Sequence, residues 1–279
     1  MNNLFQLSAQ CLRIKDPQEK ISFGQEIASQ WQNNSLEFAP DFSAVIINNP
    51  GAIDKPEIVP LKKLSKRGFR SDKQIAALLH ALAHIEMTAV NLSWDSICRY
   101  PGMPKSYYQD WINTALDEGR HFLLLQKEMN KLGYDYGDFV AHGELWEMAV
   151  KTGHNLMHRM AIVHRVLEAR ALDVVPISIK QFEEIKLVDT VKALTTIAND
   201  EIGHVAAGTK WFRYCCEQEQ CDSDKKFFEL INHYMSSPPR GPFNEDARIK
   251  AGFSEYEMTH LIENDQQYKS KQNMSMKQG

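Results

Sequence analysis

The sequence Asp-Glu-Gly-Arg-His occupies residues 117–121, and Asp-Glu-Ile-Gly-His occupies residues 200–204. A lone Glu lies upstream of each motif at almost the same distance, 32 residues before the Glu of the first motif and 33 before that of the second. Because residues i and i+3 share one face of an α-helix, each Glu-x-x-His offers a carboxylate and an imidazole to one point in space. The repeated spacing predicts two helical hairpins, each carrying three metal ligands.

The two motifs and the two upstream Glu residues together match a known set of metal ligands. Di-iron and di-manganese carboxylate bundles use one Glu from each of two helices and a Glu-x-x-His from each of the other two. We predict six metal ligands in this chain: Glu86, Glu118, His121, Glu168, Glu201 and His204.

The helix faces that carry these residues are otherwise apolar or small. On the first two predicted helices the neighbours are Leu79, Leu82, Ala83, Ala89, Val90, Trp111, Ala115, Phe122 and Leu125. Four carboxylates in such an interior would repel one another unless cations bound them. The alternative is four exposed salt-bridge faces on an ordinary helical protein. A third Glu-x-x-His, at residues 257–260, lacks both the preceding Asp and the upstream Glu, and we interpret it as a surface coincidence.

The spacing also predicts the fold class, which is all-α. We expect a four-helix bundle made of two antiparallel hairpins joined by one long crossover. The expected bundle helices cover about 73–98, 104–133, 154–174 and 179–217, with Pro176 ending the third. Outside the bundle we expect two short N-terminal helices broken at Asp16-Pro17, a proline-rich extended arm over 40–70, helices at about 224–235 and 254–264, and a frayed polar tail. The expected domains are an N-terminal arm (1–72), the bundle (73–217) and a C-terminal helical cap (218–279).

Three further polar residues are candidates for supporting the ligands. A ligating His usually donates its other N–H to a carboxylate, so Asp117 and Asp200 are expected to contact the His of the opposite motif; a capping or solvent-exposed role is the alternative. His164 lies four residues before Glu168 and shares its helix face. It is a candidate additional ligand or supporting group, or else a hydrogen-bonded core histidine.

Composition limits the partners. The chain has 279 residues and a formal net charge of −4, which gives no general attraction to nucleic acid or to an anionic membrane. No run approaches the roughly 20 consecutive apolar residues of a membrane span, and the polar start lacks the features of a signal peptide. We therefore expect a cytoplasmic protein that uses neither membrane nor nucleic acid.

The pattern over about residues 73–217 resembles the ferritin-like di-iron carboxylate superfamily. More closely, His-Ala-Leu-Ala-His-Ile-Glu at 80–86, Leu-Glu-Ala-Arg-Ala-Leu-Asp at 167–173 and Asp-Glu-Ile-Gly-His at 200–204 look like the uncharacterised family DUF455. The C-terminal pattern Pro-Phe-Asn-x-x-Ala-Arg-x-x-Ala-Gly-Phe at 242–253 also fits that family. A more distant comparison is the tRNA hydroxylase of the same superfamily. The resemblance implies a ferritin-like fold and a metal site, but no substrate.

Symmetry and resemblance assign roles to the ligands. Glu118 and Glu201 would bridge the metals and act as the catalytic residues, and each His would bind one ion. Carboxylate and imidazole ligands suit iron or manganese better than structural zinc. The expected cofactors are two iron ions, with manganese or a mixed manganese–iron pair as the alternative.

Six protein ligands shared by two metals leave positions open for O2, water or substrate. The leading hypothesis is an O2-dependent oxidase or hydroxylase of an unidentified small molecule, served by an electron-donor protein; homo-oligomerisation is also possible for such a bundle. A ferroxidase that handles iron and a metal-stabilised interaction protein are the alternatives.

Overall fold

Helices make up every regular element in the described part of the chain, which comprises residues 3–37, 42–52 and 55–276 of a computed structural model. Its only β pairings are two isolated bridges, Asn3 with Glu37 and Ile58 with Ala141. The all-α prediction is confirmed. The chain divides into two compact units, one made of Met1–Val150 and Phe182–Ala193, the other of Lys151–Gln181 and Leu194–Gly279. The expected division into three domains stays a prediction.

The first unit is built from long helices whose ends follow local sequence signals. Its elements are α1 (Leu4–Arg13), α2 (Pro17–Gln32), the 3-10 turn η1 (Leu61–Lys63), α3 (Asp72–Arg99), α4 (Lys105–Lys131) and most of α5 (Glu144–Thr152). Asp16 caps α2 by accepting the Glu19 N–H at 2.9 Å, and Ser71 caps α3. Both are residue types that satisfy the free N–H groups at a helix start. The predicted break at Asp16-Pro17 is confirmed.

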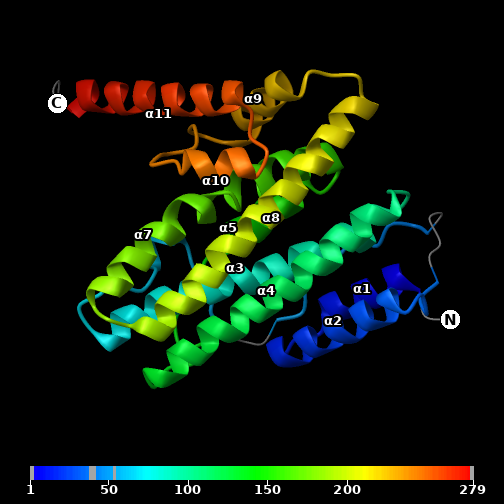
Figure 1. Cartoon of the computed structure of the whole chain (residues 1–279), viewed down its shortest axis with the longest axis horizontal. Helices are drawn as coiled ribbons and strands as arrows, with labels where there is room; N and C mark the ends of the chain where they lie inside the picture. The colour runs from blue at the N-terminus through cyan, green and yellow to red at the C-terminus, as the bar shows by residue number, and fades with distance from the viewer. Residues whose placement is uncertain (1–2, 38–41, 53–54, 277–279) are drawn as a thin grey trace. The chain divides into compact units, whose positions relative to one another are not determined.

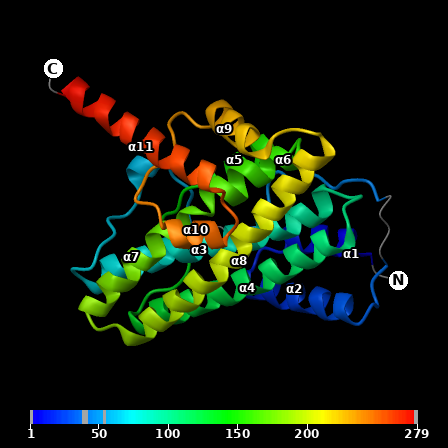
Figure 2. The ribbon, with the colours of Figure 1, turned by 45° about the horizontal axis from the view of Figure 1, so that its top comes forward.

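Helices α3 and α4 form the core of this unit and lie side by side (Figures 1 and 2). Helix α3 is the one described helix that is long and apolar enough to cross a membrane by composition, but 78% of its apolar window is buried. Such burial is typical of a helix packed in a protein core.

In the second unit the predicted helix boundaries were less accurate. Its elements are α6 (Leu156–Arg159), the π-helix η2 (Met160–Leu167), most of α7 (Arg170–Glu184), most of α8 (Val188–Gln218), α9 (Ser223–Tyr234), α10 (Glu245–Lys250) and α11 (Glu255–Met276). The expectation that Pro176 ends a helix is wrong, because Pro176 lies inside α7. Proline cannot supply the N–H that the carbonyl of Leu172 would accept. The side-chain amide of Asn244 supplies it instead, at 3.2 Å. The next helix also begins later than expected, at Val188, after a turn in which Lys186 has φ of 60°.

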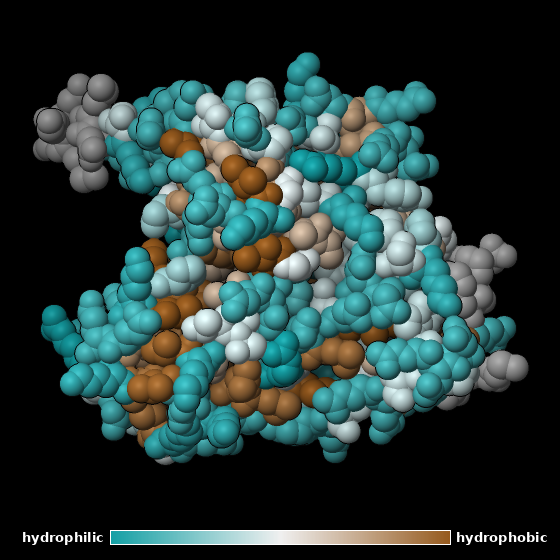
Figure 3. Space-filling model, in the orientation of Figure 1, coloured by the Kyte–Doolittle hydropathy of each residue, from teal (hydrophilic) through white to brown (hydrophobic). Residues whose placement is uncertain are grey.

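The C-terminal segment is more ordered than its composition suggested. Residues expected to fray continue α11 to Met276, and side chains four apart pair along it, as Lys269 does with Asp265 at 2.5 Å. Such i,i+4 pairs stabilise exposed helices. In the space-filling view the residues along α11 are mostly hydrophilic (Figure 3). The interpretation of Glu257 as a surface residue is wrong, because its side chain is buried and lies 2.7 Å from Arg165.

Candidate metal centre

Three of the predicted ligands come together in the first unit. Glu86 lies on α3, and Glu118 and His121 lie on α4. All three are buried: Glu86 is 6% exposed, Glu118 2% and His121 0%. His121 Nδ1 lies 3.1 Å from Glu86 Oε2 and 3.5 Å from Glu118 Oε2. The helical i,i+3 spacing brings Glu118 to His121, and the packing of α3 against α4 adds Glu86.

This cluster is electrostatically costly unless protons or cations neutralise it. Burial, together with the nearby Glu118 carboxylate, raises the pKa of Glu86 to about 8. Burial alone would lower the pKa of His121, but hydrogen bonds to Glu118 and Glu86 outweigh it and raise that pKa to about 11. Two buried carboxyl groups therefore share their environment with one protonated imidazole. A divalent cation can replace these protons and neutralise both carboxylates.

The other three predicted ligands lie in the second unit. His204 Nδ1 lies 3.6 Å from Glu201 Oε1, within the motif on α8, and both side chains are buried. Glu168 is also buried, and its Oε2 lies 2.7 Å from Nδ1 of His164. The expected shared face of His164 and Glu168 is therefore present in the structure, and the part that His164 plays at a metal stays a prediction.

Glu168 directly follows the π-helix η2, which the sequence did not indicate. Its N–H donates to the carbonyl of Val163, five residues back, at 2.9 Å. This i→i−5 pattern widens the helix locally, and π-helical turns often occur at functional sites. The side chains of His164 and Glu168 are thus positioned by a backbone irregularity immediately before the predicted ligand.

The chemistry of the donor groups fits a metal ion. Buried Glu and His side chains that could hold one include Glu118 and His121 on α4 and Glu201 and His204 on α8. They supply carboxylate oxygens and imidazole nitrogens, without a thiolate. Such a mixture suits iron or manganese.

Comparison with known proteins identifies the family. The DUF455 family, described as proteins of unknown function, matches residues 13–259. The chain belongs to the DUF455 family. An uncharacterized protein of Haemophilus influenzae is 38% identical to this DUF455 chain over 271 residues, and the alignment covers 93% of each chain. No solved structure matches this DUF455 chain. The resemblance to DUF455 is therefore confirmed, and the wider ferritin-like relationship stays a prediction.

The two acidic residues that precede the motifs are only half-buried in this DUF455 protein. Asp117 accepts a hydrogen bond from Arg120 Nη2 at 2.7 Å, on the same helix. The expected crossed pairing of Asp117 and Asp200 with the His residues of the opposite motifs stays a prediction.

Proposed function

We propose that this protein is a dinuclear metal carboxylate enzyme, most simply di-iron, that uses O2 to oxidise or hydroxylate an unidentified small molecule. The observation that carries the proposal is the buried group formed by Glu86, Glu118 and His121. Buried carboxylates without a neutralising partner are strongly disfavoured, so their presence in the core supports a cation-binding role.

In this proposal Glu168, Glu201 and His204 of the second unit are ligands as well. Glu118 and Glu201 would be the carboxylates that the two metals share, Glu86 and Glu168 would be terminal carboxylates, and each motif His would bind one ion. The bound ions would supply the positions for O2 and the electrons for its reduction. The chain itself provides negative charge that holds the ions and a buried environment that excludes bulk water.

His164 has a separate role in the proposal. Its Nδ1 lies 2.7 Å from Glu168 Oε2, so it can orient that carboxylate or hold a proton beside it. Asp117 and Asp200 would orient the two ligating imidazoles. The electrons needed after each turnover are assigned to a separate donor protein.

The first test is the metal content of anaerobically purified protein, measured by elemental analysis. We expect about two irons per chain, as in related carboxylate bundles, and their loss in the His121→Ala/His204→Ala double variant. His233→Ala is the matched control, because His233 is exposed on α9 and is not one of the proposed ligands. Wild-type protein that stays metal-free after reconstitution with ferrous or manganous ions would overturn the proposal.

O2 consumption then separates the enzyme from the alternatives. A substrate-dependent oxidase consumes O2 catalytically when supplied with a reductant, whereas a ferroxidase consumes it in proportion to added ferrous iron. If the Glu118→Ala/Glu201→Ala variant loses stability and no O2 turnover exists to lose, the metal is structural and the protein is an interaction module.

A further inference from the structure

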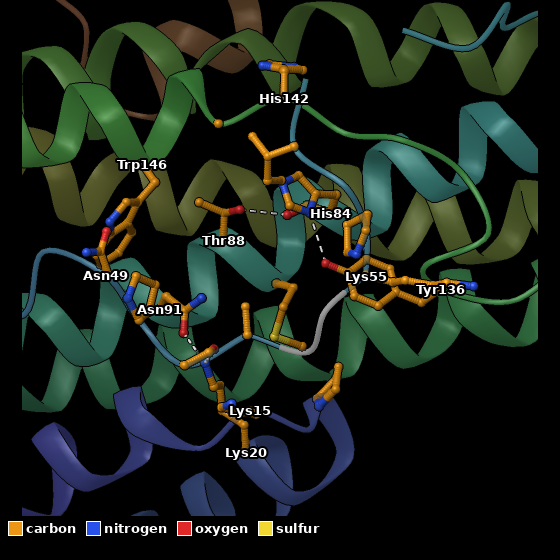
Figure 4. Close-up of a pocket in the computed structure, with 18 of the residues that line it drawn as sticks. Lys15, Lys20, Asn49, Lys55, His84, Thr88, Asn91, Tyr136, His142 and Trp146 are labelled. Atoms are coloured by element: carbon orange, nitrogen blue, oxygen red, sulfur yellow. Dashed lines mark hydrogen bonds between the residues drawn. The ribbon is translucent and has the colours of Figure 1, made fainter. Parts of the chain in front are cut away.

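The first unit contains a cavity of about 330 Å³ that none of the six proposed ligands lines. Figure 4 shows its walls, which come from the start of α2, residues 49–52 and 55–58 of the arm, the middle of α3 and the segment that leads into α5. The volume lies at the lower end of the range for small-molecule sites, roughly 300–1,000 Å³. The cavity is large enough for a compact organic ligand.

Lys20 is the feature of this cavity that requires explanation. Its side chain lines the cavity although the residue is only 1% exposed. Its Nζ lies 2.5 Å from Asn91 Oδ1 and 3.1 Å from the carbonyl oxygen of Gly51 (Figure 4 shows the contact with Asn91). Both acceptors are neutral, and in the described part of the chain no carboxylate forms an ion pair with Lys20. Burial lowers the pKa of Lys20 to about 8.

A buried ammonium group normally has an anionic partner, because removing it from water is costly. An ammonium also has three N–H donors, and two acceptors account for two of them. The geometry of Lys20 thus leaves one donor and one positive charge without a counterpart at the wall of a cavity.

The remaining charged groups of the lining add to the excess of positive charge at the cavity. Lys15 and Lys55 are exposed, while Glu147 is the acidic residue of the lining and is also exposed. His84 stays neutral at physiological pH, because burial lowers its pKa to about 4. Three lysines against one glutamate give the cavity a positive potential, which raises the local concentration of anions.

The apolar part of the lining indicates the rest of the ligand. It is formed by Pro17, Pro50, Ala52, Pro56, Ile58, Met87 and Trp146. The indole N–H of Trp146 donates to the carbonyl of Asn48 at 2.7 Å, so the ring faces a ligand mainly as an apolar surface. A largely apolar pocket with a few placed polar groups is the usual form of a small-molecule site.

We propose that this cavity binds a small organic anion, whose carboxylate or phosphate group contacts the Lys20 ammonium and whose apolar body packs against Met87 and Trp146. The proposal does not depend on the metal centre, since its residues are separate from the proposed ligands. It predicts binding to the metal-free protein as well.

The test is isothermal titration calorimetry with benzoate and phenyl phosphate, and with benzyl alcohol as the neutral counterpart. The two anions distinguish a carboxylate from a phosphate ligand. Titrations use wild-type protein and the metal-ligand variant His121→Ala/His204→Ala. Anion binding can then be judged even if the metal proposal fails. Circular dichroism checks that each variant is folded.

Two substitutions test Lys20 in different ways. Lys20→Met removes the charge, and Asn91→Asp keeps the lysine but gives it an internal carboxylate in the place of Asn91 Oδ1. Each should weaken binding of the preferred anion by at least about tenfold, roughly the effect of losing one charge-assisted hydrogen bond. Lys63→Met is the matched control: Lys63 is exposed on the same arm and lies outside the lining.

The expected result is saturable binding of one or both anions, none of benzyl alcohol, and loss in both variants but not in the control. Absence of binding by either anion at millimolar concentration overturns the proposal. So does binding that Lys20→Met and Asn91→Asp leave unchanged.

Discussion

Two deeply buried cationic side chains, Arg165 and Lys20, differ in how the protein neutralises them. Arg165 is fully buried, and its Nη2 lies 2.7 Å from Glu257 Oε2. The ring centroids of Phe212, Phe227 and Phe253 lie within 5.0 Å of its guanidinium carbon. Lys20 has two neutral acceptors and a cavity. Arg165 therefore has an anionic partner within the protein, whereas Lys20 leaves that part to a ligand.

This contrast gives a stability prediction for Lys20→Met. The folded-state pKa of about 8 lies below the ordinary value of 10.5. Below pH 8 both folded and unfolded chains carry the charge, and the folded state bears the full burial penalty. Between pH 8 and 10.5 the folded state loses the Lys20 proton while the unfolded state keeps it, so wild-type stability rises with pH. Above pH 10.5 both states are neutral at Lys20, and the burial penalty is gone. We expect Lys20→Met to be more stable than wild type at neutral pH, by up to about 3 kcal/mol, and the difference to shrink as pH rises above 8.

Thermal unfolding of the ligand-free protein across this pH range measures that difference. Other titratable groups near Lys20 include Cys11, and the cavity lining adds Lys15, Lys55, His84, Tyr136, His142 and Glu147. Burial raises the pKa of the Cys11 thiol to about 12 and so keeps it protonated. All of these groups remain in both proteins, so they cancel in the comparison. If Lys20→Met is less stable than wild type at neutral pH, its hydrogen bonds outweigh its burial and the prediction is wrong.

The buried acidic group and Lys20 differ in how far the sequence predicts them, and the reason is physical. The group of Glu86, Glu118 and His121 was predictable because helical periodicity and a repeated spacing converge on it; its metal-binding role stays a prediction. Lys20 offered one weaker signal, a lysine on the apolar face of α2 beside Pro17 and Ile21. Burial of a single lysine depends on which segments cover it, here α3 and the arm, and periodicity does not contain that information.

At the level of elements, the helices that begin with local caps were predicted well and α7 was not. A cap acts over three residues, as Asp16 does for Glu19. The continuation of α7 through Pro176 depends instead on Asn244, which lies 72 residues from the carbonyl that it satisfies. A prediction based only on the residues next to Pro176 therefore places the end of the helix too early.

Asn244 should consequently matter for both helices that it joins. Its amide donates to Leu172 O, and its Oδ1 accepts the Ala247 N–H at the start of α10. We expect Asn244→Ala to lower the free energy of unfolding by about 1–3 kcal/mol, because a part-buried carbonyl loses its donor and a helix loses its cap. Chemical denaturation measures the loss.

A second substitution separates the two contributions. Serine is a good capping residue but too short to replace the amide, so Asn244→Ser should recover only the cap, about 1 kcal/mol. Asn232→Ala, at an exposed position on α9, is the control. Full recovery by serine would show that the amide of Asn244 does not support α7 at Pro176.

On the scale of the whole molecule, the proposed ligands are divided equally between the two units. Glu86, Glu118 and His121 belong to the first, and the other three belong to the second. Local motifs could predict each set of three ligands. They could not predict whether the two sets combine, because that depends on the fold of the complete chain. That combination is the part of the proposed function that needs its own experiment.

If the two sets form one dinuclear centre, removing a ligand from either unit should disturb the whole. We expect His121→Ala and His204→Ala each to abolish most of the metal-dependent rise in unfolding temperature, and the double variant to lose little more, since ligands of one site act non-additively. The measurement is calorimetric unfolding with and without ferrous or manganous ions, with His233→Ala as control. Independent sites in each unit would behave differently: each single variant would lose its own share of the stabilisation, and the losses would add in the double variant. Additive losses would therefore replace the shared centre with two separate mononuclear sites.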